Sequence, residues 1–128
     1  MKVPNDLLYT KEHEWVKVEG DVATVGITDY AQDQLGDIIY VELPEVGRKV
    51  KQMEAVATVE AVKTAADVYS PVSGEVIETN PKLSDKPELL NQDPYGEGWM
   101  FKIKVENPEE LKNLLSPEEY RKLIEAEG

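Results

Sequence analysis

Lys63 is the residue of this chain whose surroundings are best suited to chemistry. It lies in the segment EAVKTAAD (60–67), where the side chains next to the lysine are small or aliphatic and an acid stands at each end. Strand-like patterns flank the segment, so we expect a hairpin with Lys63 at or near its tip. A lysine in such a turn is in most proteins only a solvated charge. A compact, projecting hairpin nevertheless presents one exposed, acylatable amine to a modifying enzyme.

Other reactive groups are few. The chain has no cysteine, which excludes a disulfide framework, a thiol nucleophile and a cysteine-type zinc site. The single histidine, His13, stands between Glu12 and Glu14. One histidine beside two acids lacks the convergent spacing of metal ligands, and no nucleophile–base set accompanies it. We therefore expect no metal and no catalytic residue, and interpret His13 as a structural or surface residue.

Composition narrows the class of protein further. In 128 residues, 26 Asp and Glu outweigh 14 Lys and Arg, which gives a formal net charge of −12. Such a charge repels phosphate backbones, so we expect no nucleic-acid partner. No apolar run is long enough to span a membrane or to form a signal-peptide core, and 41% hydrophobic residues suffice for a folded core. We expect a monomeric, cytoplasmic protein with one domain over residues 1–128 and no membrane partner.

The hydrophobic pattern predicts short strands over the first hundred residues and helices at the end. The expected strands are 22–27, 36–43, 55–59, 67–69, 74–79 and 99–105. A short helix is expected over 28–36, from a capping threonine to a terminating glycine. Two more start signals, NPEE (107–110) and SPEE (116–119), predict two helices packed on a β-body of about residues 1–105. The C-terminal helical segment covers about 107–128.

Two of the expected strands are similar in sequence. GDIIYV (36–41) and GEVIET (74–79) share a glycine, an acid, a β-branched residue and an isoleucine. Each is followed by a turn-rich stretch and another strand, as in a repeat whose halves pack face to face. Coincidence between two short strands is the alternative, and the pattern alone leaves both open. In either case, Lys63 lies between the two copies.

Several segments of the sequence resemble those of a known protein family. VEAVKTAADVYSPVSGEV (59–76) resembles the lipoyl-lysine segment of the glycine cleavage system H proteins. Further blocks agree in order along the chain. They are YTKEHEWV (9–16), VGITDYAQDQLGDIIYVELPEVG (25–47), DPYGEGWMFKIK (93–104) and LKNLLSPEEYRKL (111–123). Several long blocks in one order are far more specific than a single motif.

The resemblance implies a mainly β fold, a barrel-sandwich hybrid of the lipoyl/biotinyl type extended by short helices. It also implies that Lys63 carries lipoate as an amide. Glu14 and Asp67 match the positions at which this family contacts the arm, and from the sequence alone they could equally be solvated acids. Carboxylates suit the cationic aminomethyl group that such an arm carries.

The function implied is that of a shuttle, not an enzyme. It takes the aminomethyl group of glycine from glycine decarboxylase (P protein) to the aminomethyltransferase (T protein), and then presents dihydrolipoyl to dihydrolipoamide dehydrogenase (L protein). A lipoate ligase or lipoyltransferase is the fourth implied partner.

Alternatives of the same and of other classes remain. An H-like protein could relay lipoate to other enzymes. A biotin carrier would place methionines beside its lysine, whereas Val62 and Thr64 flank Lys63. A lipoyl domain of a 2-oxoacid dehydrogenase would have an aspartate where Val62 stands, and a linker. A small hydrolase would need a nucleophile and a base, and a pure interaction module would leave the hairpin lysine unexplained.

Overall fold

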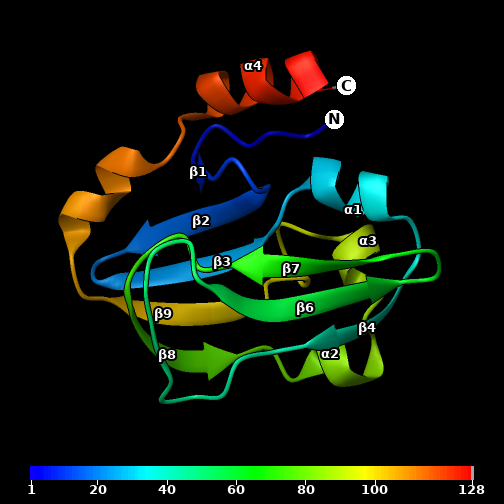
Figure 1. Cartoon of the computed structure of the whole chain (residues 1–128), viewed down its shortest axis with the longest axis horizontal. Coiled ribbons are helices and arrows are strands. Elements are labelled where there is room, and N and C mark those ends of the chain that lie inside the picture. Colours follow the sequence, from blue (N-terminus) through cyan, green and yellow to red (C-terminus); the bar gives the residue numbers. More distant parts are fainter. Residues whose placement is uncertain (128) are drawn as a thin grey trace.

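In a computed structural model, which describes residues 1–127, the chain forms two antiparallel sheets with helices around them (Figure 1). The strands of the larger sheet are, in spatial order, β1 (Leu8–Tyr9), β2 (Glu14–Glu19), β3 (Val22–Ile27), β9 (Phe101–Val105), β8 (Gly74–Thr79) and β5 (Lys49–Val50). Those of the smaller sheet are β4 (Ile38–Glu42), β6 (Ala55–Ala61) and β7 (Ala65–Tyr69). The helices are α1 (Asp29–Leu35), α2 (Lys82–Asp85), α3 (Leu89–Gln92), the 3₁₀-helix η1 (Pro108–Asn113) and α4 (Pro117–Glu127).

All six expected strands are confirmed, with shifts of a few residues at their ends. Helix α1 is confirmed together with its signals. Thr28 Oγ1 accepts a hydrogen bond from the Ala31 N–H, and Gly36 ends the helix with a φ of 80°. The strands β1, β2 and β5 were not expected.

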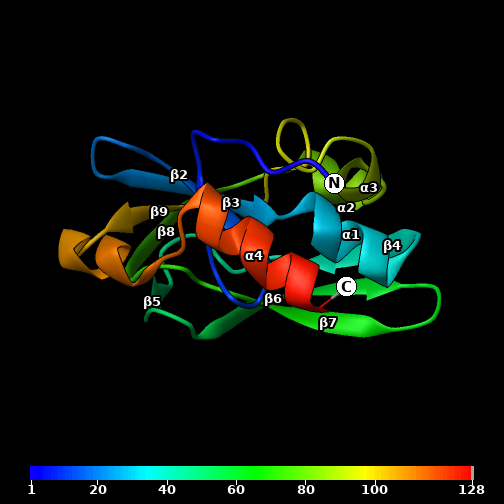
Figure 2. The ribbon, with the colours of Figure 1, turned by 90° about the horizontal axis from the view of Figure 1, so that it is seen from above.

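The first of the two expected C-terminal helices is the 3₁₀-helix η1. The chain just beyond η1 explains why this helix ends. Leu115 exchanges two backbone hydrogen bonds with Tyr9, at 2.9 and 2.7 Å, so the chain must be extended there and the helix cannot continue. Helix α4 then begins with a capping box, in which Ser116 and Glu119 bond each other's backbone N–H. Figures 1 and 2 show α4 lying across the top of the molecule, with its end on the side of α1.

The two sheets share one apolar core. Val25, Val76 and Ile103 from the larger sheet belong to the same buried cluster as Val41 and Val59 from the smaller one. A second cluster joins the chain's ends, because Tyr120 of α4 stacks on Tyr9 with ring centroids 4.6 Å apart. As expected, the tail packs its apolar stripes on the β-body.

The two similar segments become equivalent strands in different sheets. β4 lies in the smaller sheet and β8 in the larger, and both have an irregular register at the same place. Ile39 and Ile77 occupy the irregular positions and are exposed, whereas Ile38 and Val76 before them are buried. This shared irregularity supports the repeat over coincidence.

Gly36, which precedes β4, and Gly74, which begins β8, differ in how closely other atoms surround them. Substitution by alanine is therefore expected to destabilise the protein to different extents. A methyl group at Gly74 would lie 2.0 Å from the Lys104 carbonyl oxygen, whereas at Gly36 it would meet open space. We expect Gly74→Ala to lower the free energy of unfolding by about 3 kcal/mol or more, because backbone must move. Gly36→Ala should cost only about 1–2 kcal/mol for its positive φ. Urea unfolding checks this, and equal losses in both variants would contradict it.

Candidate functional site

Lys63 lies in the turn between β6 and β7, and its side chain is exposed. The hairpin that these two strands form projects from the body of the molecule (Figure 1). The turn is tight, since the Ala61 N–H donates to the Thr64 carbonyl at 2.8 Å. A second bond, from the Val62 N–H to the Asp37 carbonyl at 3.1 Å, ties the tip to the segment before β4. The sheet therefore holds the lysine in a fixed place while its amine stays accessible.

A cleft of about 420 Å³ runs beside this hairpin, between β7 and helix α1. Glu14 and Asp67 both line it, so the structure brings together two of the three predicted site residues. Lys63 is not part of the lining and stands beyond the cleft. The other lining residues are Glu12, His13, Ile27, Tyr30, Ala31, Gln34, Leu35, Val59, Ala66, Val68, Tyr69 and Glu127.

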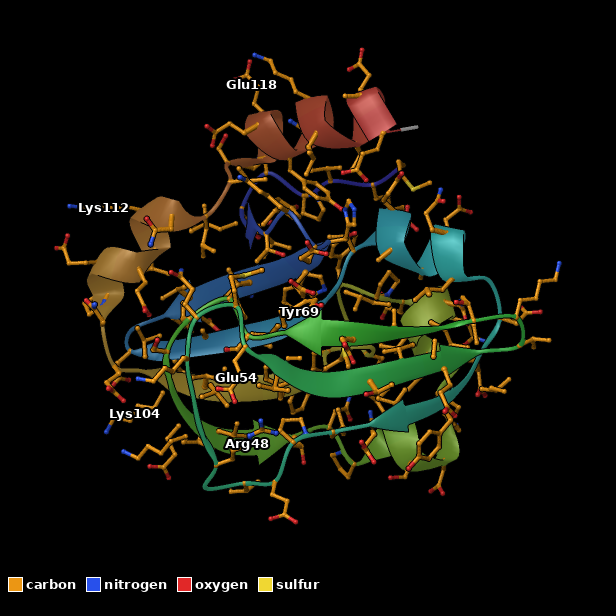
Figure 3. The ribbon with its side chains drawn as sticks, viewed as in Figure 1. Arg48, Glu54, Tyr69, Lys104, Lys112 and Glu118 are labelled. Carbon is orange, nitrogen blue, oxygen red and sulfur yellow. The ribbon has the colours of Figure 1, made fainter. Side chains whose placement is uncertain are left out.

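Glu14 is a buried carboxylate that connects the two sheets. It lies at the start of β2, and its side chain is 1% exposed. One oxygen accepts from Thr10 Oγ1 at 2.5 Å and the other from the Tyr69 N–H at 3.2 Å. Because β7 is an edge strand of the smaller sheet, Tyr69 offers this N–H on the free edge (Figure 3).

Burial changes the acidity of Glu14. Loss of solvation raises its pKa from 4.5 to about 7, although the hydrogen bonds from Thr10 and Tyr69 oppose the shift. Glu14 is therefore divided between its two forms near neutral pH. A cation placed in the cleft would favour the ionised form.

Asp67 differs from Glu14 in its exposure. It lies on β7 opposite Thr58 of β6, and its side chain is exposed at the hairpin side of the cleft. It adds a negative charge without the desolvation that Glu14 undergoes.

The cleft also includes residues that the sequence did not single out as functional. His13 and Tyr30 lie with ring centroids 4.8 Å apart, and Glu127 comes from the end of α4. His13 has a positive φ of 74°, which is uncommon for a residue other than glycine. No sequence pattern pairs residue 13 with residue 127, because the contact spans nearly the whole chain.

The cleft's lining suits a particular kind of occupant. Apolar side chains such as Ile27, Val59 and Val68 would pack along an aliphatic chain, and the four carboxylates would attract a positive charge. A flexible arm of this kind fits the residues present.

At the other end of the molecule from the hairpin, Arg48 and Glu54 form an ion pair at 3.1 Å (Figure 3).

Within residues 1–127, no three or more His, Cys, Asp or Glu side chains are grouped so as to hold a metal ion. Over the same range, every helix is too short or too polar to cross a membrane.

Comparisons with known proteins agree with one another. The family model described as "Glycine cleavage H-protein" matches residues 7–127. A "Glycine cleavage system H protein" of Thermus thermophilus is 58% identical over 128 residues, covering 100% of both chains. A "Probable glycine cleavage system H protein" of Aeropyrum pernix is 64% identical over 115 residues, 90% of this chain and 80% of its own. The crystal structure of such a protein from Mycobacterium marinum superposes with a TM-score of 0.83 at 37% identity, covering 94% of this chain and 97% of that one.

Proposed function

Because this chain belongs to the glycine cleavage H-protein family, we propose that Lys63 is the residue to which its lipoyl group is attached, as an amide on Nζ. The protein is the lipoyl carrier of the glycine cleavage system, moving an aminomethyl group between enzymes, and is not itself an enzyme. Its fold is the barrel-sandwich hybrid of lipoyl carriers. The proposal therefore concerns which residues of this chain perform the role.

The observation that carries the proposal is the position of Lys63. Its amine is exposed at the tip of a tight hairpin, beside a carboxylate-lined cleft. An attaching enzyme needs such a projecting amine, and the small side chains around it leave room for that enzyme's surface. Amide formation also removes the positive charge of Lys63, so the lysine no longer competes with a cationic cargo for the carboxylates of the cleft.

The bound lipoyl group supplies a cyclic disulfide that a chain without cysteine cannot provide. Residues of the chain itself orient and shield it. The apolar lining of the cleft packs along the aliphatic part of the arm and excludes water. Glu14 and Asp67 hold the cationic end of the cargo, Glu14 as a buried partner and Asp67 as an exposed one. Tethering keeps the cargo at high local concentration near each enzyme.

The partners follow from membership of the glycine cleavage system, which implies the P, T and L proteins. We propose in addition that a lipoate ligase or lipoyltransferase modifies Lys63. The protein would work as a single, monomeric domain over residues 1–128 in the cytoplasm. Its net charge of −12 suits basic docking surfaces on these partners.

Mass spectrometry of the protein expressed together with a lipoate ligase tests the proposal. We expect the intact chain to gain one lipoyl group, and peptide mapping to place it on the peptide that contains Lys63. The same experiment with a biotin ligase should leave the mass unchanged. A biotinyl group, no modification, or a lipoyl group on another lysine would each overturn the assignment.

A further inference from the structure

His13 connects the cleft to the end of the C-terminal helix. Its Nδ1 lies 2.8 Å from the Tyr120 hydroxyl and its Nε2 lies 3.0 Å from Glu127 Oε1. Both partners belong to α4, more than a hundred residues away along the chain. His13, Glu127 and Tyr30 all line the cleft. His13, interpreted from the sequence as a structural or surface residue, thus lies between the cleft and helix α4.

The hydrogen bonds around His13 form a continuous series. Thr28 Oγ1 lies 2.7 Å from the Tyr120 hydroxyl and already accepts from the Ala31 N–H. Burial raises the pKa of Tyr120 above its ordinary value, so this phenol keeps its proton. With Thr28 donating to Tyr120, Tyr120 to Nδ1, and Nε2–H to Glu127, each hydroxyl and imidazole proton has an acceptor. This assignment satisfies the series with a neutral imidazole ring.

Helix α4 is anchored unevenly along its length. At its beginning, the Ser116–Glu119 capping box and the fully buried Tyr120 hold it against Tyr9. Leu123 and Ile124 still pack on the second cluster, and beyond them Glu125 and Ala126 face solvent. Among residues 125–127 of the described chain, the His13–Glu127 pair is the one side-chain hydrogen bond to the rest of the protein. The position of the last three described residues of the helix therefore depends on His13.

We propose that His13 is a positioning residue that holds the end of α4 against the cleft, so that Glu127 forms one of its walls and α4 limits water's access to the cargo. The end of α4 lies over the space between α1 and the β6–β7 hairpin, where this wall is needed (Figure 2). The bond from Nε2 also fixes the direction of the Glu127 carboxylate. The part concerning the cargo rests on the function proposed above, whereas the anchoring of α4 does not.

Hydrogen exchange on the unlipoylated full-length chain tests the anchoring. His13→Asn suits this test because asparagine tolerates positive φ better than most residues. We expect His13→Asn and Glu127→Ala each to speed exchange of the backbone amides of residues 124–127 about threefold to tenfold, the size of one lost hydrogen bond to a charged group at a partly exposed site. Amides in β2 and β3 should not change.

Matched controls separate this contact from general effects on the helix. Glu125→Ala makes the same chemical change two residues away on an exposed side chain, and should leave exchange at the end of α4 unchanged. The double variant with His13→Asn and Glu127→Ala should exchange no faster than His13→Asn alone, because that substitution already removes the bond that Glu127→Ala removes. Unchanged exchange in the single variants, or additive effects in the double variant, would overturn the anchoring.

A second measurement on the lipoylated protein tests the wall. A glycine decarboxylase from an organism with a related H protein loads the aminomethyl group onto the lipoyl arm. Hydrolysis of the loaded arm then releases formaldehyde and ammonium and leaves the arm as a free thiol. We expect formaldehyde release to be several-fold faster in His13→Asn and Glu127→Ala than in the unsubstituted chain and Glu125→Ala, with equal lipoylation in all four. Faster hydrogen exchange without faster formaldehyde release would refute the proposal that α4 shields the cargo. It would not affect the assignment of Lys63 as the attachment residue. An unsubstituted chain that accepts no lipoate would refute the proposed function and leave the exchange result valid.

Discussion

A Lys63→Arg variant is expected to accept no lipoyl group and to support no glycine cleavage. Arginine keeps the positive charge and the length of the side chain, but its guanidinium stays protonated and is not acylated by such enzymes. The Lys63 side chain is exposed and takes no part in the ion pairs of residues 1–127. The free energy of unfolding should therefore change by less than about 0.5 kcal/mol. The measurements are intact mass after co-expression with a lipoate ligase, and glycine-dependent NADH formation with the three partner enzymes.

A second lysine variant serves as the control for this loss. Lys17 is also exposed, but lies on β2 away from the hairpin, so Lys17→Arg should be lipoylated and active to the normal extent. Residual activity of Lys63→Arg, or a lipoyl group on another of its lysines, would show that Lys63 is not the attachment residue.

A Glu14→Gln variant is expected to be more stable than the natural chain at pH 8 and less able to protect the cargo. The native pKa of Glu14 is raised to about 7, so the folded state favours the protonated form. Its contribution to stability is complete below pH 4.5 and is lost as the pH rises towards 7. That loss amounts to about 2–3 kcal/mol, and glutamine, which cannot ionise, should avoid it. Chemical denaturation at pH 5 and pH 8 measures this difference.

If Glu14 holds the cargo as proposed, the same variant should also protect the cargo less well. Glutamine cannot offer a negative charge to the cationic cargo, so formaldehyde release from the loaded arm should be faster. Asp67→Asn should act in the same direction and less strongly, because Asp67 is exposed. Glu12→Gln, at another acid of the cleft, should not reproduce the gain in stability, because Glu12 is exposed. A Glu14→Gln chain that is less stable at pH 8, or that keeps the natural pH dependence, would contradict the prediction.

The strands that the sequence predicted are those with a local signal. Six segments combine β-branched residues with bounding turn residues, and all six form strands. Strand β2 was missed, although Val16 and Val18 alternate with polar residues in EWVKVE. Strands β1 and β5 have two residues each, which is too few for any periodicity. Helices α2 and α3 have four residues each and are missed for the same reason.

The site was predictable where a residue's role depends on its neighbours in sequence. The tip position of Lys63 follows from the strands beside it, and the structure confirms it. The burial of Glu14 does not follow, because it results from Tyr69 and Thr10 closing over the start of β2. Likewise, the contact of His13 with Glu127 needs the packing of Tyr120 on Tyr9, which only the folded chain reveals.

The hydrogen bond from Tyr69 to Glu14 has a consequence for self-association. Unpaired backbone groups on a sheet edge invite pairing with another chain and, at high concentration, aggregation. At each edge of the three-stranded sheet, one backbone N–H already donates a hydrogen bond to a side chain. On β7 the Tyr69 N–H donates to Glu14, and on β4 the Ile38 N–H donates to Asn91 Oδ1 at 3.0 Å. A second copy of the chain therefore cannot add a full-length strand to either edge. If Lys63 carries the lipoyl group as proposed, these two contacts would hinder pairing of its hairpin with a second copy and leave the hairpin accessible to the partner enzymes.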